Sequence, residues 1–275
     1  APYDAVLTHG FVLDEQGRKM SKSLGNITAP QKVINEFGAD ILRLWVVGSD
    51  YYDDLRIGKE ILIRHSDHYR RLRNTLRYLL GALNEFDERE KINFTEMPEL
   101  EKWVLHRVSE LSEKIHENTE KFNLHDIYLD IHNFCTIDLS AFYFDIRKDT
   151  LYCEDYSSVE RKSCRTVMDI LFKSLTTWLA PIICFTAEEA WQSRYKDSKN
   201  SVHLQTYFKG DKNWKNDELG KKWSDIRELR SVVTTSIEEK RKEGILGSSL
   251  QAKVLIEANG DSYKVLQDAN LPEIF

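Results

Sequence analysis

The residues best suited to chemistry lie near the start of the chain, in the run Lys-Met-Ser-Lys-Ser at residues 19–23. Two lysines and two serines are followed there by Gly25, on a polar stretch just before a predicted helix. Lysine ammonium groups neutralise phosphate oxygens, serine hydroxyls add hydrogen-bond donors, and glycine lets a loop move. The run could therefore stabilise charge that develops on a departing pyrophosphate, although composition alone also allows a solvated basic turn.

A second group that could contact phosphate is the arginine-rich helix predicted over residues 61–80. Five arginines stand against one aspartate there, in a chain whose net charge is −6. Arg70, Arg73 and Arg77 recur at positions i, i+3 and i+7, which places them on one helix face. Concentrated arginine suggests contact with nucleic-acid phosphates. The alternative is a solvated face whose arginines pair with neighbouring acids.

A third basic cluster precedes Gly244 and contains Arg241, a further candidate RNA contact, although such runs usually face solvent. Metal chemistry is not indicated. The four cysteines form no Cys-x-x-Cys pair, so we expect reduced thiols in a cytoplasmic protein. His106, His116 and His132 are spaced too widely for a metal-binding pair on a helix face, and no metal is expected.

The remaining sequence predicts the helices that would position these groups. Gly and Pro are scarce, at 12 and 5 of 275 residues, which favours long helices. Apolar residues recur with the 3.6-residue period of an amphipathic helix. The stretches concerned are residues 59–84, 101–122, 124–149, 159–179 and 224–243. We therefore expect a mainly α fold, an antiparallel bundle of four or five helices.

Shorter elements should flank the bundle. Pro30 suits the first turn of a helix that Gly38 would end, and Asp40 suits the N-cap of the next helix. Thr186 opens a capping-box sequence that should restart a helix after Pro181.

Towards the end of the chain, residues 250–256 alternate between apolar and polar, which predicts a half-buried strand. Residues 261–268 favour one more short helix. No second strand follows, so this α/β piece looks incomplete.

With its flanks, the run at residues 19–23 resembles the signature loop of class I aminoacyl-tRNA synthetases. Other motifs resemble isoleucyl-tRNA synthetases in particular, since valyl and leucyl enzymes usually differ at residues 41–46 and 50–57. The resemblance covers nearly the whole chain. Its motifs are residues 8–14, 17–18, 23–26, 38–46, 49–51, 54–57, 73–75, 134–135, 138–140, 180–182 and 185–189.

The resemblance implies a role for each residue of the loop. Lys22 matches the lysine expected to contact ATP phosphates and stabilise the transition state of adenylate formation, and Lys19 would support it electrostatically. Ser21 and Ser23 would position the ATP-binding loop, with Met20 packed beneath it. The implied reaction joins isoleucine to ATP with Mg²⁺, releases pyrophosphate, and then esterifies the 3′ end of tRNA.

The resemblance also implies a division of the chain. Residues 1–58 would end the catalytic domain, 59–215 would form the anticodon-binding bundle, and 216–275 an incomplete α/β junction. The expected partner is an isoleucine-acceptor tRNA, and the protein is expected to be monomeric, without membrane contact.

One element of class I catalysis, His-x-Gly-His, does not occur in this sequence. We therefore expect a C-terminal piece of an isoleucine–tRNA ligase that is inactive alone. A valyl-tRNA synthetase fragment and a non-catalytic tRNA-binding helical module are the alternatives.

Overall fold

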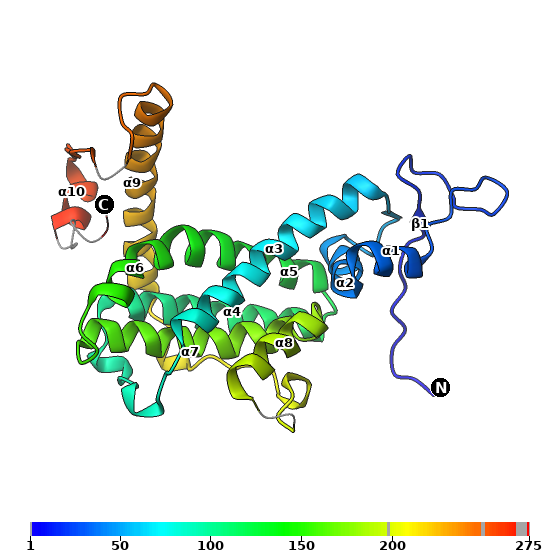
Figure 1. Cartoon of the computed structure of the whole chain (residues 1–275), viewed down its shortest axis with the longest axis horizontal. Coiled ribbons are helices and arrows are strands. Elements are labelled where there is room, and N and C mark those ends of the chain that lie inside the picture. The colour runs from blue at the N-terminus through cyan, green and yellow to red at the C-terminus, as the bar shows by residue number, and fades with distance from the viewer. Residues whose placement is uncertain (1, 197–198, 249–250, 268–273, 275) are drawn as a thin grey trace.

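The chain is described here from a computed structural model, which places residues 2–196, 199–248, 251–267 and 274. Figure 1 shows three parts: a small N-terminal lobe around β1, a central helical bundle, and the long helix α9, which projects from the bundle with α10 beside it. The elements in chain order are β1 (Val12–Leu13), α1 (Pro30–Phe37), α2 (Ala39–Gly48), β2 (Leu55–Arg56), α3 (Lys59–Ala82), α4 (Glu99–Glu120), α5 (Leu124–Asn133), α6 (Phe144–Cys153), α7 (Val159–Leu179), α8 (Cys184–Tyr195), α9 (Asp217–Lys242) and α10 (Gly260–Gln267).

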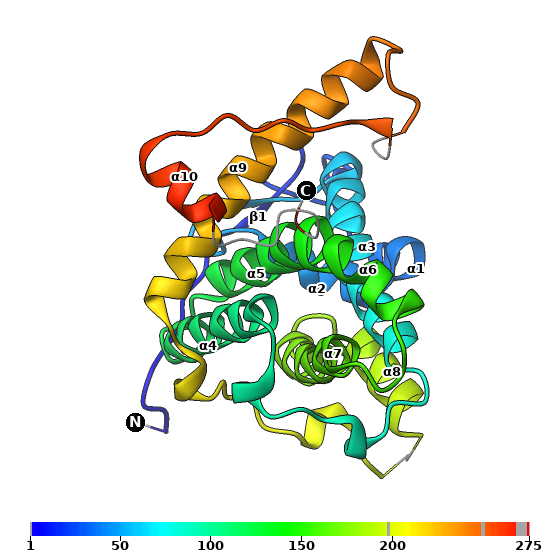
Figure 2. The same ribbon diagram turned by 90° about the vertical axis from the view of Figure 1, so that its left-hand side faces the viewer.

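Helix α7 is the centre of the bundle. Figure 2 shows it nearly end-on, with the other bundle helices around it. Of its 21 residues, 16 are buried, including polar ones. The buried hydroxyls of Thr166, Ser174, Thr176 and Thr177 bond back to the helix, as when Thr176 Oγ1 donates to the carbonyl of Phe172 at 2.6 Å. Because these four hydroxyls are satisfied within the helix, α7 can carry several serines and threonines in the core.

The predicted mainly α architecture is confirmed. The aromatic side chains predicted to be core rather than base-stacking platforms are all buried. They are Trp103, Phe134, Phe142, Tyr143, Trp178 and Trp191. Burial of one large apolar side chain contributes about 1.5–3 kcal/mol, so this set is a large part of what holds the bundle together.

The N-terminal lobe has its own small core, formed by Val33, Trp45, Tyr51, Leu55, Ile57 and Leu62. Strands β1 and β2 pair in parallel, with Val12 opposite Leu55. Gly10 lies so close to this pairing that a Cβ there would approach the carbonyl oxygen of Asp53 to 2.1 Å. The chain thus reaches the predicted ATP loop from a two-stranded anchor.

The helix predicted over 124–149 and the strand predicted over 250–256 need correction. The helix predicted over 124–149 is interrupted by π-helical turns at Phe134–Tyr143, between α5 and α6. The strand predicted over 250–256 does not form in its described part, residues 251–256, since no partner strand pairs with it there. Residue 250 lies outside the described residues.

Helix α9 begins seven residues earlier than predicted, because the Asn216 side chain caps it by accepting from the backbone N–H of Leu219 at 3.0 Å. Among the described residues, no helix combines the length and apolar character needed to cross a bilayer.

Candidate functional site

The loop at residues 19–25 is fastened at its base by Asp14 and Asn26. The Asp14 carboxylate, 6% exposed, accepts from the backbone N–H of Arg18 at 2.8 Å and from Asn26 Nδ2 at 2.9 Å. Asn26 Oδ1 in turn accepts from the backbone N–H of Ser21 at 2.9 Å. The hydrogen bonds from Asn26 and Arg18 lower the pKa of Asp14 to about 2, so the carboxylate is charged at neutral pH.

The sequence predicts a turn at residues 14–17 and shows Asp14 and Asn26 as flanks of the signature motif, without a role for either side chain. A signal for Asp14 was available, because an aspartate three residues before Gly17 is typical of a turn held by its own side chain.

Inside the loop, the predicted ATP-binding residues divide into two kinds. The hydroxyls of Ser21 and Ser23 lie 3.1 Å apart and shape the turn. Met20 is half-buried against the lobe core, as a packing residue would be. Lys19 and Lys22 are exposed, and neither ammonium group has a hydrogen-bond or ion-pair partner among the described residues. Both charges are thus available to an anionic ligand.

The predicted basic face runs along α3. Arg70, Arg73 and Arg77 are all exposed on it. Arg70 pairs with Asp67 at 2.8 Å, whereas Arg73 and Arg77 have no ion pair among the described residues. An exposed pair of this kind contributes at most about 1 kcal/mol, so Arg70 can exchange its partner for a phosphate at little cost.

The basic cluster at the end of α9 is arranged differently. Arg241 pairs with Glu238 at 2.5 Å and Lys240 with Glu243 at 2.7 Å, each within the same stretch of chain. These pairs reduce the local positive charge. Arg241 is therefore less available to RNA than the α3 arginines, although it remains exposed.

A clasp joins the N-terminal lobe to the bundle. Asp40, 7% exposed, accepts from the backbone N–H of Thr186 at 2.8 Å and from its hydroxyl at 2.7 Å. Arg43 donates to the carbonyls of Pro181 at 2.6 Å and Ile182 at 3.1 Å. The clasp holds the N-terminal lobe, which carries the loop, against the first turn of α8. The loop and the basic face of α3 are therefore connected through packed structure as well as through the chain.

This clasp corrects two predicted caps. Asp40 does not cap its own helix, because Gly38 is the N-cap of α2 and Asp40 lies in its first turn. Thr186 does not open α8, which begins at Cys184 without a side-chain cap of its own. The free N–H groups of α8 are satisfied from α2 instead, by a carboxylate 146 residues away in sequence.

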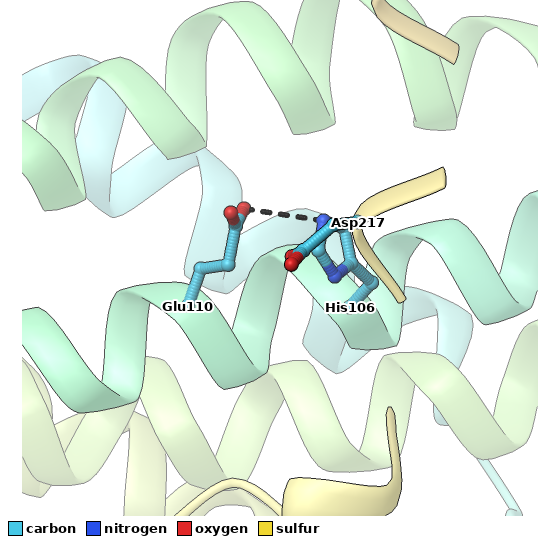
Figure 3. Close-up of side chains that lie close together, drawn as sticks. All are labelled: His106, Glu110 and Asp217. Atoms are coloured by element: carbon cyan, nitrogen blue, oxygen red, sulfur yellow. Dashed lines mark ion pairs between the residues drawn. The ribbon is translucent and has the colours of Figure 1, made fainter. Parts of the chain in front are cut away.

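Figure 3 shows His106, Glu110 and Asp217, whose ligand atoms lie within 4.8 Å of one another. His106 Nδ1 accepts from the backbone N–H of Asn216 at 3.0 Å, so in the neutral ring Nε2 carries the proton and faces Glu110 at 3.4 Å. A metal at Nε2 would need that proton removed and the Asn216 contact broken. The group is better suited to holding the start of α9 on α4, and His106 is an interface residue.

Two families of known proteins match this chain, one over its N-terminal segment and one over most of the remainder. Residues 101–256 match the family described as the anticodon-binding domain of tRNA ligase. Residues 1–58 match the family of class I tRNA synthetases (I, L, M and V). In structure, the chain is similar to the agnB2 LeuRS of Agrobacterium radiobacter K84, solved as a ternary complex with tRNA and LeuAMS. The TM-score is 0.60 at 18% identity, over 76% of this chain and 24% of that one, which shows a shared fold.

The chain therefore belongs to the anticodon-binding domain family of tRNA ligases, and it carries a class I synthetase segment ahead of that domain. Its relatives are isoleucine–tRNA ligases, which confirms the resemblance seen in the sequence. The protein of Gluconobacter oxydans is 52% identical over 93% of this chain, and that of Zymomonas mobilis is 51% identical over 100% of it. The chain spans only 27% and 30% of those two proteins.

Proposed function

We propose that the chain is the tRNA-binding part of an isoleucine–tRNA ligase, with an isoleucine-acceptor tRNA as its partner. The observation that carries the proposal is the clasp between α2 and α8. It joins the lobe that carries a loop with two lysines, neither paired with any described residue, to a bundle of the anticodon-binding family. Positive charge is then presented at the loop, where ATP would bind, and along α3, where tRNA phosphates would bind.

In this proposal the loop at residues 19–25 binds ATP within a full-length isoleucine–tRNA ligase, of which this chain is a part. Lys22 contacts the phosphates and stabilises the charge that grows on the departing pyrophosphate, and Lys19 adds to the field. Ser21 and Ser23 hold the turn, with Met20 anchoring it to the lobe. ATP would carry Mg²⁺, which shields the same phosphate charge.

We propose the following division of the chain. Residues 1–58 end the catalytic part, 59–215 bind the tRNA, and 216–275 form the junction. Arg70, Arg73 and Arg77 contact tRNA phosphates, with Arg241 as a weaker contact. The monomeric state and the cytoplasmic location stay predictions.

Alone, the chain should not form isoleucyl-adenylate, because it lacks the His-x-Gly-His element. Isoleucine-dependent exchange of pyrophosphate into ATP, measured on the purified chain, should remain at background. A clear exchange signal would contradict this part of the proposal.

The proposal as a whole is tested by measuring the affinity of the chain for isoleucine and valine tRNA transcripts. Tighter binding of the isoleucine transcript is expected. Equal binding of both would favour a non-specific tRNA-binding module, tighter binding of the valine transcript would favour the valyl alternative, and no binding of either would reject the proposal.

A further inference from the structure

The start of α3, which lies beside the N-terminal lobe in Figure 1, is capped by a side chain from outside the helix. Its N-cap residue, Gly58, has no side chain that could accept from the free N–H groups of the first turn. Glu15 Oε1 accepts from the backbone N–H of Glu60 at 3.1 Å instead, across 45 residues of sequence. A carboxylate at this end of a helix also stabilises the helix dipole. Glu15 therefore supports a helix to which it does not belong.

Gly58 leaves room for this cap. Its backbone is extended, with a φ of −172°, so its conformation alone does not call for glycine. A Cβ at Gly58 would, however, stand 2.1 Å from Cγ and 2.3 Å from Oε1 of Glu15. Glycine is needed because the Glu15 side chain lies across the start of the helix. No cation pairs with the Glu15 carboxylate within the described ranges, so an ion pair does not explain its place.

The turn at residues 14–17 is attached to the start of α3 beyond the point where strand pairing stops. The pairing of β1 with β2 ends at Leu13, which lies opposite Arg56. Past that point, the guanidinium of Arg56 lies over Gly17, with its Nη2 3.3 Å from the position that a Cβ would take there. The hydrogen bond from Glu60 to Glu15 is a second contact. Two side chains thus extend the attachment from the strands to the whole turn.

The same turn holds the base of the loop at residues 19–25. Asp14, the neighbour of Glu15, accepts from the backbone N–H of Arg18 at 2.8 Å and from Asn26 Nδ2 at 2.9 Å. A movement of Glu15 away from α3 would therefore displace the carboxylate that fastens the loop. The two loop lysines form no hydrogen bond or ion pair with α3 among the described residues. Their placement relative to α3 depends on the turn.

We propose that Glu15 is a positioning residue for the loop at residues 19–25. By capping α3 it sets the turn at residues 14–17 against the start of the helix, and the turn sets the loop. Glu15 does not meet the phosphates itself, which is the task of Lys19 and Lys22. The value of this placement for adenylate formation rests on the proposed function, whereas the placement itself can be measured without ATP or tRNA.

The test is amide hydrogen exchange, resolved by residue, in the chain and in its Glu15→Ala, Glu15→Gln and Glu120→Ala variants. Two amides report: that of Glu60, which donates to Glu15, and that of Ser21, which donates to Asn26 inside the loop. Both should exchange about fivefold faster in Glu15→Ala, since the cap and the loop open together. Glu15→Gln keeps an acceptor oxygen and should stay within about twofold of the unsubstituted chain. Glu120, exposed on α4, is the matched control and should change neither amide.

Three results would overturn the inference. Faster exchange at Glu60 alone would make Glu15 a helix cap without a hold on the loop, and no change at either amide would mean that the cap does not form. An equal acceleration in the buried helix α7 would show a general loss of stability instead of a local role. None of these results touches the proposed function, which fails separately if the chain does not bind the isoleucine transcript.

Discussion

At the scale of single residues, the shape of the loop at residues 19–25 depends mainly on the side chains of Asp14 and Asn26 at its base. Asp14 and Asn26 together bond to the backbone at Arg18 and Ser21, on both sides of Lys19. Because Asp14 and Asn26 hold the turn, Lys19 and Lys22 need no partner for it, and none lies among the residues that the structure describes. A loop kept in shape without using its own charges is suited to receive an anion.

Removing this support should loosen the loop. In Asn26→Ala, the bonds from Ser21 and to Asp14 are lost, so residues 19–25 open more often. Limited trypsin digestion should then cut after Lys19 and Lys22 several-fold faster than in the unsubstituted chain. Asn35→Ala, which removes only a surface contact to Gln31, is the control. Equal cleavage in both variants would show that Asn26 does not hold the loop.

One buried ion pair fixes α4 to α6. Glu101, 0% exposed, accepts from Arg147 at 2.6 and 2.7 Å and from the Tyr143 hydroxyl at 3.1 Å. Glu101→Ala leaves the arginine charge buried, so it should lower the free energy of unfolding by about 3–5 kcal/mol in urea titrations. Glu117→Ala breaks only an exposed pair with Lys121 and should lower the free energy of unfolding far less. Similar values for the two variants would contradict this reading of Glu101.

At the scale of elements, the long helices were predictable and the clasp was not. Residues 159–179 carry a regular apolar period, and α7 forms over that range. The same apolar period predicts an uninterrupted α-helix through residues 134–143. The backbone there forms wider π-helical turns instead. Local sequence predicts that Asp40 caps its own helix, because it shows only neighbours along the chain. The groups that Asp40 actually bonds belong to α8, far away in the sequence. Whether Lys19 and Lys22 have partners likewise depends on their neighbours in space, and within the described ranges they have none.

The clasp should be measurable. Asp40→Ala leaves the N–H groups of Phe185 and Thr186 without their acceptor and should cost about 1–3 kcal/mol of unfolding free energy. Hydrogen exchange at the start of α8 should accelerate in the same variant. Asp149→Ala, an exposed position on α6, is the control. Unchanged exchange in α8 would mean that Asp40 does not cap it.

Between α3 and α5, three imidazoles lie together. The ring centres of His68 and His132 are 4.7 Å apart, and those of His65 and His68 are 5.9 Å apart. Burial lowers the pKa of His65 to about 4 and also lowers the pKa of His68 and His132. Nearby arginines, Arg64 and Arg71, act in the same direction.

In the unfolded chain these histidines bind protons near pH 6.5, whereas in the folded chain they bind protons only at lower pH. Stability should therefore be lost as pH falls from 6.5 towards 4. The melting temperature should therefore fall over this range, and His65→Gln should flatten the fall. His203→Gln, at an exposed position, should leave it unchanged. A pH profile that His65→Gln does not alter would contradict the assignment.

At the scale of the whole molecule, an acidic chain presents a basic face. The net charge of −6 gives no hint of RNA binding, but most charges elsewhere are of mixed sign, whereas α3 exposes five arginines on one helix. Electrostatic attraction to RNA depends on such local fields more than on the total. RNA contact by the arginine face of α3 remains a prediction. The structure adds that Arg73 and Arg77 are exposed and form no ion pair among the described residues.

The most direct test of tRNA binding by this face is the salt dependence of affinity for the isoleucine transcript, in the unsubstituted chain and in the Arg70→Ala/Arg73→Ala variant. Loss of two phosphate contacts should weaken binding and reduce the slope of log K against log salt by about 2. The Lys121→Ala/Lys148→Ala variant removes the same charge elsewhere and should keep the slope. An unchanged slope in the arginine variant would contradict the account and return α3 to a solvated face.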